Sequence, residues 1–198
     1  MADQFNRKGA GAFDRHDLVT AIKDFKRAVF FNSSNPAHHN NLAYVLYQSK
    51  DYEEAEIEFQ KALSEHPDES LLRQIKINQS LLYCDNQAAF LKPARKTWNE
   101  KGIGVLKELL EKDSDNAEYH MRLGFAYFQS TNPGGGFSEL DKAAQLATPE
   151  EIGRYTPDKV GGALLILKQI QQFYVKVRLF KKAELIQNKI KRLEENGT

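Results

Sequence analysis

The sequence contains one cysteine, Cys84, and almost no net charge. A single cysteine cannot form an internal disulfide or a four-cysteine zinc site, so nothing in the sequence indicates an oxidising compartment. The 28 basic and 27 acidic residues leave a formal charge of +1, which provides no strong long-range field. The overall charge therefore favours neither nucleic acid nor a membrane surface as a partner.

Long apolar runs are missing as well. The first residues, MADQFNRKGAGAFD, contain no apolar stretch long enough for a secretory signal, and nowhere do about 18 uncharged apolar residues occur together. We therefore expect a cytoplasmic location and no membrane partner. The chain is nevertheless too hydrophobic to be disordered, because 41% of its 198 residues are apolar and these include twelve Phe and eight Tyr.

Motifs for catalysis and metal binding are also missing. The sequence contains no GxSxG motif, no phosphate-binding loop followed by Lys and Ser or Thr, and no dinucleotide fingerprint. The histidines occur without an HExxH or Cys-x-x-Cys pattern; they are His16, His38, His39, His66 and His120. We therefore expect a chain that is not an enzyme and that uses no metal and no cofactor.

Internal repetition is the strongest feature that the sequence does contain. A shift of 34 residues superimposes small and aromatic positions, Ala21, Phe25 and Ala28 on Ala55, Phe59 and Ala62. This spacing is typical of stacked helix pairs, in which small residues lie where two helices approach closest and large ones fill the space between. Pro67 follows the second set and is expected to end its helix.

The segment NLAYVLYQSKDYEEAEIEFQKALSEHP resembles the tetratricopeptide repeat throughout, with Leu42, Ala43 and Leu46 preceding the repeated positions. The resemblance implies an all-α fold, a right-handed superhelical array of about five antiparallel helix pairs, of which the third and fifth are degenerate. It also implies a non-catalytic scaffold or adaptor that binds a partner protein or peptide in a concave groove. Family members share this scaffold and differ in what it holds, so the partner is not implied.

The period and the resemblance together predict one domain over residues 1–198. Its expected parts are repeat 1 at about 2–35, repeat 2 at about 36–69, a degenerate repeat 3 with an insertion at about 70–115, repeat 4 at about 117–149, and a terminal helical pair at about 157–195.

Two places depart from the regular pattern. The segment NPGGG, residues 132–136, is expected to be the turn inside repeat 4, because three consecutive glycines resist helix formation. The segment around residues 85–101 is longer than a repeat turn by about 13 residues. Either the neighbouring helices are longer than usual, or an extra element lies beside the array.

The resemblance also implies which residues line the groove, because the first helix of each pair supplies it. The expected partner-binding residues are Asn41, Tyr44, Gln48, Asn78, Arg122, Phe125 and Gln129. Amide side chains can hydrogen-bond to the backbone of an extended peptide, aromatic rings offer apolar area, and Arg122 can pair with a carboxylate. The alternative for aromatic residues at helical spacing is burial in the core, which we favour for Tyr47 and Phe128.

Other functions stay open beside the adaptor. The last part of the chain is basic and predicts either a solvated helix face or a nucleic-acid-associated repeat; its cations are Lys176, Arg178, Lys181, Lys182, Lys189, Lys191 and Arg192. Aromatic residues, which nucleic-acid binding favours, are missing after Phe180, so nucleic acid is not the expected partner. A self-assembling structural unit, and hence a homo-oligomer, is a further alternative. A small secretion chaperone fits less well, because those proteins are acidic and have three repeats.

Overall fold

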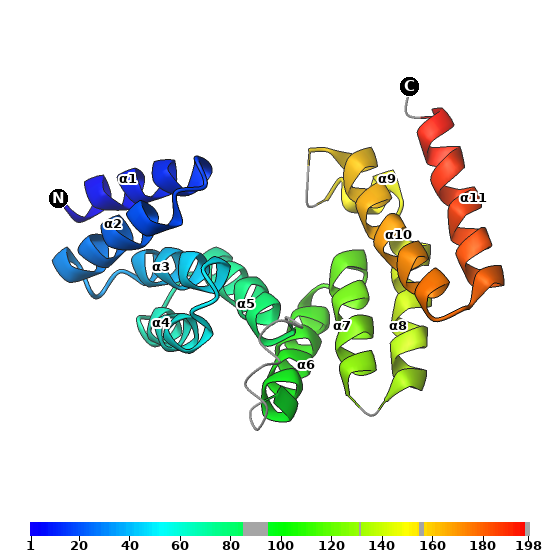
Figure 1. Cartoon of the computed structure of the whole chain (residues 1–198), viewed down its shortest axis with the longest axis horizontal. Coiled ribbons are helices and arrows are strands. Elements are labelled where there is room, and N and C mark those ends of the chain that lie inside the picture. The colour runs from blue at the N-terminus through cyan, green and yellow to red at the C-terminus, as the bar shows by residue number, and fades with distance from the viewer. Residues whose placement is uncertain (85–94, 131, 155–156, 197–198) are drawn as a thin grey trace. The chain divides into compact units, whose positions relative to one another are not determined.

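The computed structural model describes residues 1–84, 95–130, 132–154 and 157–196, and the regular secondary structure of these residues is helical throughout (Figure 1). The chain divides into two compact units, Met1–Val105 and Leu106–Thr198. Across the described ranges, no helix is both long and apolar enough to cross a membrane. The predicted all-α class is confirmed.

The first unit consists of consecutive helical hairpins. Its helices are α1 (Ala2–Asp14), α2 (Leu18–Phe31), α3 (Pro36–Gln48), α4 (Tyr52–Ser64), α5 (Glu69–Cys84) and the first part of α6 (Arg95–Lys112). The side chain of Asp17 accepts a hydrogen bond from the Thr20 amide and begins α2, and Asn35 caps α3 in the same way, with Pro36 in the first turn. The turns inside the first two pairs have the same form, because His16 and Lys50 both adopt a positive φ two residues after a helix ends.

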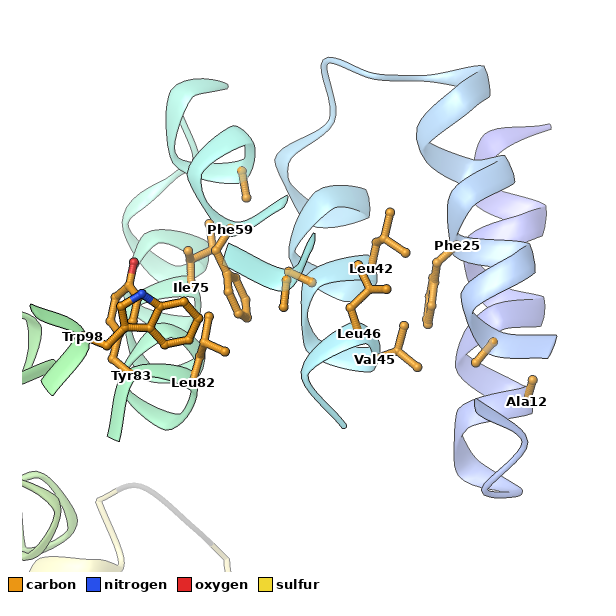
Figure 2. Close-up of a cluster of buried hydrophobic side chains, with 14 residues drawn as sticks. Ala12, Phe25, Leu42, Val45, Leu46, Phe59, Ile75, Leu82, Tyr83 and Trp98 are labelled. Carbon is orange, nitrogen blue, oxygen red and sulfur yellow. The ribbon is translucent and has the colours of Figure 1, made fainter. Parts of the chain in front are cut away.

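The core of the first unit uses the repeated positions as the sequence predicts. Ala21, Ala28, Ala55 and Ala62 are fully buried, so the helix backbones can approach closely there. Figure 2 shows Phe25 of α2 and the side chains of α3 lying against one another. Burying each such phenylalanine contributes roughly 1.5 to 3 kcal/mol to folding.

The second unit repeats this construction. After the last part of α6 come α7 (Ala117–Gln129), α8 (Pro133–Leu146), the short α9 (Pro149–Ile152), α10 (Lys159–Lys176) and α11 (Phe180–Asn196). Helices α7 and α8 pack together, as do α10 and α11. The core of this unit includes Leu140, Leu167 and Tyr174, which are almost fully buried.

The predicted turn at the triple glycine is wrong, because Pro133–Gly136 form the first turn of α8. The Asn132 side chain accepts a hydrogen bond from the Gly135 amide, which caps the helix despite the poor helix propensity of glycine. A Cβ atom on Gly136 would lie 2.7 Å from the Phe128 ring and 3.0 Å from the carbonyl oxygen of Gly124. Glycine is therefore needed here so that α8 can approach α7.

The extra length before repeat 4 lies partly in longer helices. Helix α5 has 16 residues and α6 has 18, compared with 13 or 14 in α1 to α4. Trp98 of α6 is buried and its ring meets Tyr83 of α5 edge-on at 5.7 Å. The rest of the insertion, residues 85–94, lies outside the described residues.

Candidate functional site

A cleft lies on the first unit, where the end of α1 meets the end of α3. Its volume is about 460 Å³, and it is lined by Phe13, Asp14, His16, Leu18, Tyr44 and Gln48. The α1–α2 turn, in which His16 has a φ of 61°, forms one wall. Two residues predicted from the sequence, Tyr44 and Gln48, therefore lie together at this cleft.

Asn41 lies on the same face of α3 as those two residues, because side chains three and seven positions apart share a helix face. Its amide nitrogen donates a hydrogen bond to Asn6 Oδ1 of α1 at 2.9 Å. The Asn41 amide is thus held in place by a neighbouring helix, and an amide group can form further hydrogen bonds beyond that one. Gln48, in contrast, is exposed.

Aromatic rings form the apolar wall of the cleft. The ring of Tyr44 lies 5.6 Å from that of Phe13 and 6.2 Å from that of Tyr47, and Tyr47 lies 6.2 Å from Tyr52. Tyr44 is only partly buried, so it both packs against the core and reaches the cleft. The chain of rings fixes the Tyr44 side chain before any ligand binds, which lowers the entropy lost on binding.

Asn78 lies on α5, which follows α1 and α3 among the helices expected to line the groove. Its side chain is buried, with only 6% of the residue exposed. Its amide nitrogen donates to Asn40 Oδ1 at 3.1 Å, and its carbonyl oxygen accepts from Gln74 at 3.1 Å. The bond to Asn40 connects α5 to α3, and the bond from Gln74 lies within α5, so the Asn78 side chain is held between the two helices in the free protein.

The remaining predicted residues lie in the second unit, on α7. Arg122 donates through two guanidinium nitrogens to one carboxylate oxygen of Glu118, one turn earlier in the same helix. The ring of Phe125 lies 5.4 Å from that of Phe173, on α10, and packs against the core of the unit. Gln129 at the end of the helix is partly exposed.

Phe128, for which the sequence favours a core position, packs against the core of the second unit. The centroid of its ring lies 4.6 Å from those of Phe137 and Phe173.

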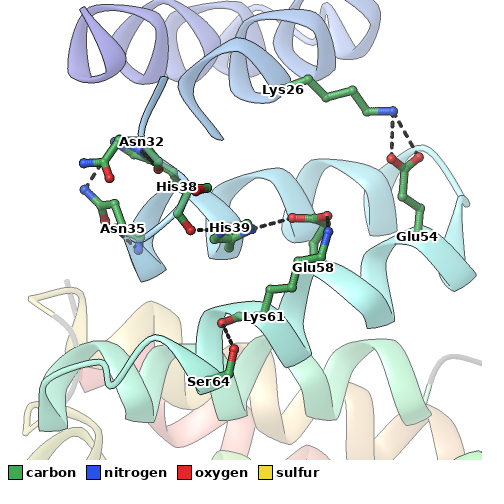
Figure 3. A network of polar contacts seen from close by, with 11 residues as sticks. Lys26, Asn32, Asn35, His38, His39, Glu54, Glu58, Lys61 and Ser64 are labelled. Carbon is green, nitrogen blue, oxygen red and sulfur yellow. Dashed lines mark hydrogen bonds and ion pairs between the residues drawn. The ribbon is translucent and has the colours of Figure 1, made fainter. Parts of the chain in front are cut away.

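Sequence reasoning missed a buried ion pair that connects the two helices of a hairpin. His39 Nδ1 lies 2.6 Å from Glu58 Oε2 (Figure 3). On the other side of the ring, His39 Nε2 lies 2.8 Å from the carbonyl oxygen of Ser33. When both ring nitrogens carry a hydrogen, the imidazole can donate to the Glu58 carboxylate and to the Ser33 carbonyl at once. Lys61 donates to the other oxygen of Glu58.

The same arrangement occurs in the second unit. His120 Nδ1 faces Glu139, and His120 Nε2 lies 2.8 Å from the carbonyl oxygen of Ser114. The three residues are the counterparts of His39, Glu58 and Ser33 at a shift of 81 positions. Two of the five histidines are thus part of the scaffold, and among the described residues no cluster of three His, Cys, Asp or Glu side chains could hold a metal ion.

Cations of the basic C-terminal helix α11 contact acceptors on α8. Lys182 pairs with Asp141 of α8 at 2.5 Å, and Lys189 donates to the carbonyl oxygens of Ala144 and Gln145. Burial lowers the pKa of the Lys189 ammonium group. These lysines dock α11 onto α8.

The sequence matches the family model described as tetratricopeptide repeat at residues 39–69, which lies within the predicted repeat 2. No curated protein matches the chain. Several solved structures share the fold. A MamA structure from Desulfovibrio magneticus RS-1 is 18% identical with a TM-score of 0.68, and the alignment covers 98% of this chain and 96% of that one.

Two further structures are similar at comparable levels. A thermophilic tetratricopeptide repeat protein of Thermus thermophilus is 19% identical with a TM-score of 0.57, covering 93% of this chain and 100% of that one. A tetratricopeptide repeat protein from Parabacteroides merdae is also 19% identical, with a TM-score of 0.58 and coverages of 98% and 76%. At these identities the likeness concerns the fold. The family match covers residues 39–69, and the structural likeness shows that the chain has the fold of tetratricopeptide repeat proteins.

Proposed function

We propose that this protein is a non-catalytic adaptor whose first unit holds a segment of a partner protein on the inner face of α1 and α3. The fold is that of protein-interaction scaffolds in general, and the repeat family is generally non-catalytic. The observation that carries the proposal is the cleft in which Phe13, Tyr44 and Gln48 come together. A cytoplasmic location belongs to the same proposal.

The chemistry of this face suits an extended peptide. Phe13 and Tyr44 offer ring faces to an apolar side chain, and their positions are fixed by mutual packing. The exposed Gln48 and the positioned Asn41 can donate to and accept from a peptide backbone. Apolar anchors flanked by polar groups that fix orientation are characteristic of binding clefts.

Contacts within the second unit favour the first unit as the binding site. Phe125 is engaged by Phe173, and Arg122 already pairs with Glu118, so each would have to leave a partner before it could bind a ligand. The lysines that hold α11 against α8 likewise favour a protein partner over a polyanion. We therefore assign the peptide contact to Tyr44, Gln48 and Asn41.

A peptide selection tests the proposal. Peptides selected from a displayed random library on the full chain are labelled, and their Kd values are measured by fluorescence anisotropy. Tyr44→Ala and Gln48→Ala are each expected to weaken binding, Tyr44→Ala by about tenfold or more. The matched control is Ile57→Ala on α4, which replaces a residue that is 54% exposed away from the cleft.

Circular dichroism separates loss of binding from loss of folding, and Gln48→Ala changes only an exposed side chain. If the selected peptides bind the Tyr44 and Gln48 variants as tightly as the wild type, the cleft is not the binding site. The cleft is also not the binding site if Ile57→Ala weakens binding as much as the Tyr44 and Gln48 variants do.

A further inference from the structure

A second surface of the first unit is exposed and aromatic. Phe30 of α2 is 81% exposed and Phe31 is 48% exposed, and their rings meet edge-on at 5.4 Å. Phe5 of α1 stacks on Phe31 with a centroid distance of 5.5 Å and an interplanar angle of 4°. We call Phe5, Phe30 and Phe31 the α1–α2 aromatic patch. Large exposed apolar groups that cluster in this way mark interaction surfaces more often than isolated ones do.

Cations surround the patch. The guanidinium carbon of Arg27 lies 5.3 Å from the centroid of the Phe5 ring, and the ammonium nitrogen of Lys8 lies 5.6 Å from it. Lys23 is exposed on α2 one turn before Arg27. The patch is therefore both apolar and positively charged.

The neighbouring carboxylates do not neutralise it. Asp24 is only 8% exposed and lies 3.4 Å from Arg27, so it holds that side chain in place and adds little to the surface. The Asp3 side chain of α1 is 78% exposed, but it contacts His38 of α3 at 3.2 Å and so lies on the side of the hairpin that faces α3. Among the described residues, the cations of α2 that form ion pairs are Lys26 and Arg27, whereas Lys8 and Lys23 form none.

The patch lies on the side of α2 that faces away from the next hairpin, α3 and α4. Phe25 points toward Leu42 and Val45 of α3 (Figure 2), and two residues along a helix turn the side chain by roughly 200°. Arg27 is two residues after Phe25 and therefore faces away from α3, toward Phe5 of α1. This surface is thus separate from the cleft, whose walls are the ends of α1 and α3.

We infer that the α1–α2 aromatic patch binds an acidic segment of a partner protein that also carries aromatic or aliphatic side chains. Burial of the phenyl rings against the partner would contribute favourable free energy of binding. Carboxylates of the partner would complement the charges of Lys8, Lys23 and Arg27. A second copy of this chain is a poorer occupant, because a symmetric contact would bring the same cations together. The inference does not rest on the cleft, since it uses other residues.

A comparative selection tests the inference. Peptides from a displayed random library are selected on the full wild-type chain after depletion on the Phe30→Ser variant, and their Kd values are measured by fluorescence anisotropy. The expected peptides are rich in Asp and Glu and contain Phe or Leu. Each should bind Phe30→Ser and Lys23→Glu about tenfold or more weakly than it binds the wild type.

Two controls fix the interpretation. Phe180→Ser removes a phenylalanine of α11 that is 62% exposed, and Gln48→Ala alters the cleft; neither should change the Kd. Because Phe30 is 81% exposed, its replacement is expected to leave the circular dichroism unchanged. Peptides with no excess of acidic residues, or equal affinities for Phe30→Ser and Phe180→Ser, would overturn the inference.

Two other occupants are distinguished by direct measurement. Sedimentation velocity over a range of concentrations would show self-association that Phe30→Ser abolishes if the patch binds a second copy. Co-sedimentation with vesicles of phosphatidylserine and phosphatidylcholine would show retention that Phe30→Ser abolishes if the patch binds an anionic membrane. Either result would replace the acidic segment as the occupant.

Discussion

Removal of the carboxylate that pairs with His39 is expected to destabilise the first unit more than removal of any exposed carboxylate. The side chains of His39 and Glu58 are only 4% and 6% exposed. In Glu58→Ala, the His39 ring loses its partner in a site with little exposure to water. Breaking a buried ion pair from one side costs about 3 to 5 kcal/mol, because the remaining polar group is left buried without a partner.

The conservative variant should cost less. Glu58→Gln keeps an oxygen that can accept the Nδ1–H bond of His39, so the expected loss is about 1 to 2 kcal/mol. Glu54→Ala is the matched control on the same helix, because Glu54 pairs with Lys26 across side chains that are 37% and 48% exposed. An exposed ion pair of this kind contributes less than about 1 kcal/mol to the free energy of unfolding.

Urea denaturation measures these differences. Trp98 is the one tryptophan of the sequence, and it is buried beside Tyr83 in the core of the first unit, so its fluorescence follows that unit. We expect the order of unfolding free energies to be wild type, Glu54→Ala, Glu58→Gln, Glu58→Ala, from highest to lowest. If Glu58→Ala unfolds at the same urea concentration as Glu54→Ala, the assignment of a buried ion pair is wrong.

Further predictions concern glycines, a turn and a tyrosine. Gly124→Ala should destabilise the protein by about 1 to 3 kcal/mol, because its Cβ would lie 2.8 Å from Leu140 Cδ2. Gly104→Ala, whose Cβ would meet nothing within 4 Å, should instead stabilise it by about 0.5 to 1 kcal/mol in the same urea assay. Lys50→Gly should raise the thermal midpoint, because Lys50 has a φ of 68° that glycine adopts without strain. Burial raises the pKa of Tyr83 from 10.0 to about 12, so the protonated hydroxyl stabilises the folded state below pH 10 and this contribution is lost as the pH rises to 12. Tyr83→Phe should therefore lose less stability than the wild type across that pH interval, and an equal loss would contradict the assignment.

The sequence predicted the hairpins because the residues that determine them act locally or recur at a fixed period. Ala21 and Ala55 mark where two helices approach, and Pro67 follows the end of α4 at Ser64, as expected of a helix stop. The triple glycine misled the prediction, since intrinsic propensity disfavours helix there while close packing against Gly124 requires glycine. Tertiary packing outweighs local propensity at that point.

The His39 and Glu58 pair could have been found in the sequence. The trio of Ser33, His39 and Glu58 recurs at a shift of 81 residues, which corresponds to two periods of 34 and the insertion of about 13 residues. A search for repeats at a shift of 34 residues alone does not find this recurrence. The insertion thus hid the recurrence of these three residues, which the structure shows.

The site was predictable only in part, because spacing gives the helix face of a residue but not its neighbours. Asn41, Tyr44 and Gln48 share a face and lie at or beside the cleft. Asn78 and Phe125 occupy comparable positions in sequence, yet Asn40 and Phe173 engage them. The repeat boundaries and the binding role of these residues stay predictions.

Site-specific photo-crosslinking tests the adaptor proposal most directly. A benzophenone side chain replaces Tyr44 in one variant and Ile57 of α4 in another, and each is irradiated with a labelled peptide selected on the wild-type chain. The proposal predicts a crosslinked product from position 44 and none from position 57. Equal crosslinking at both positions, or crosslinking at 57 alone, would contradict a partner segment held on the inner face of α1 and α3.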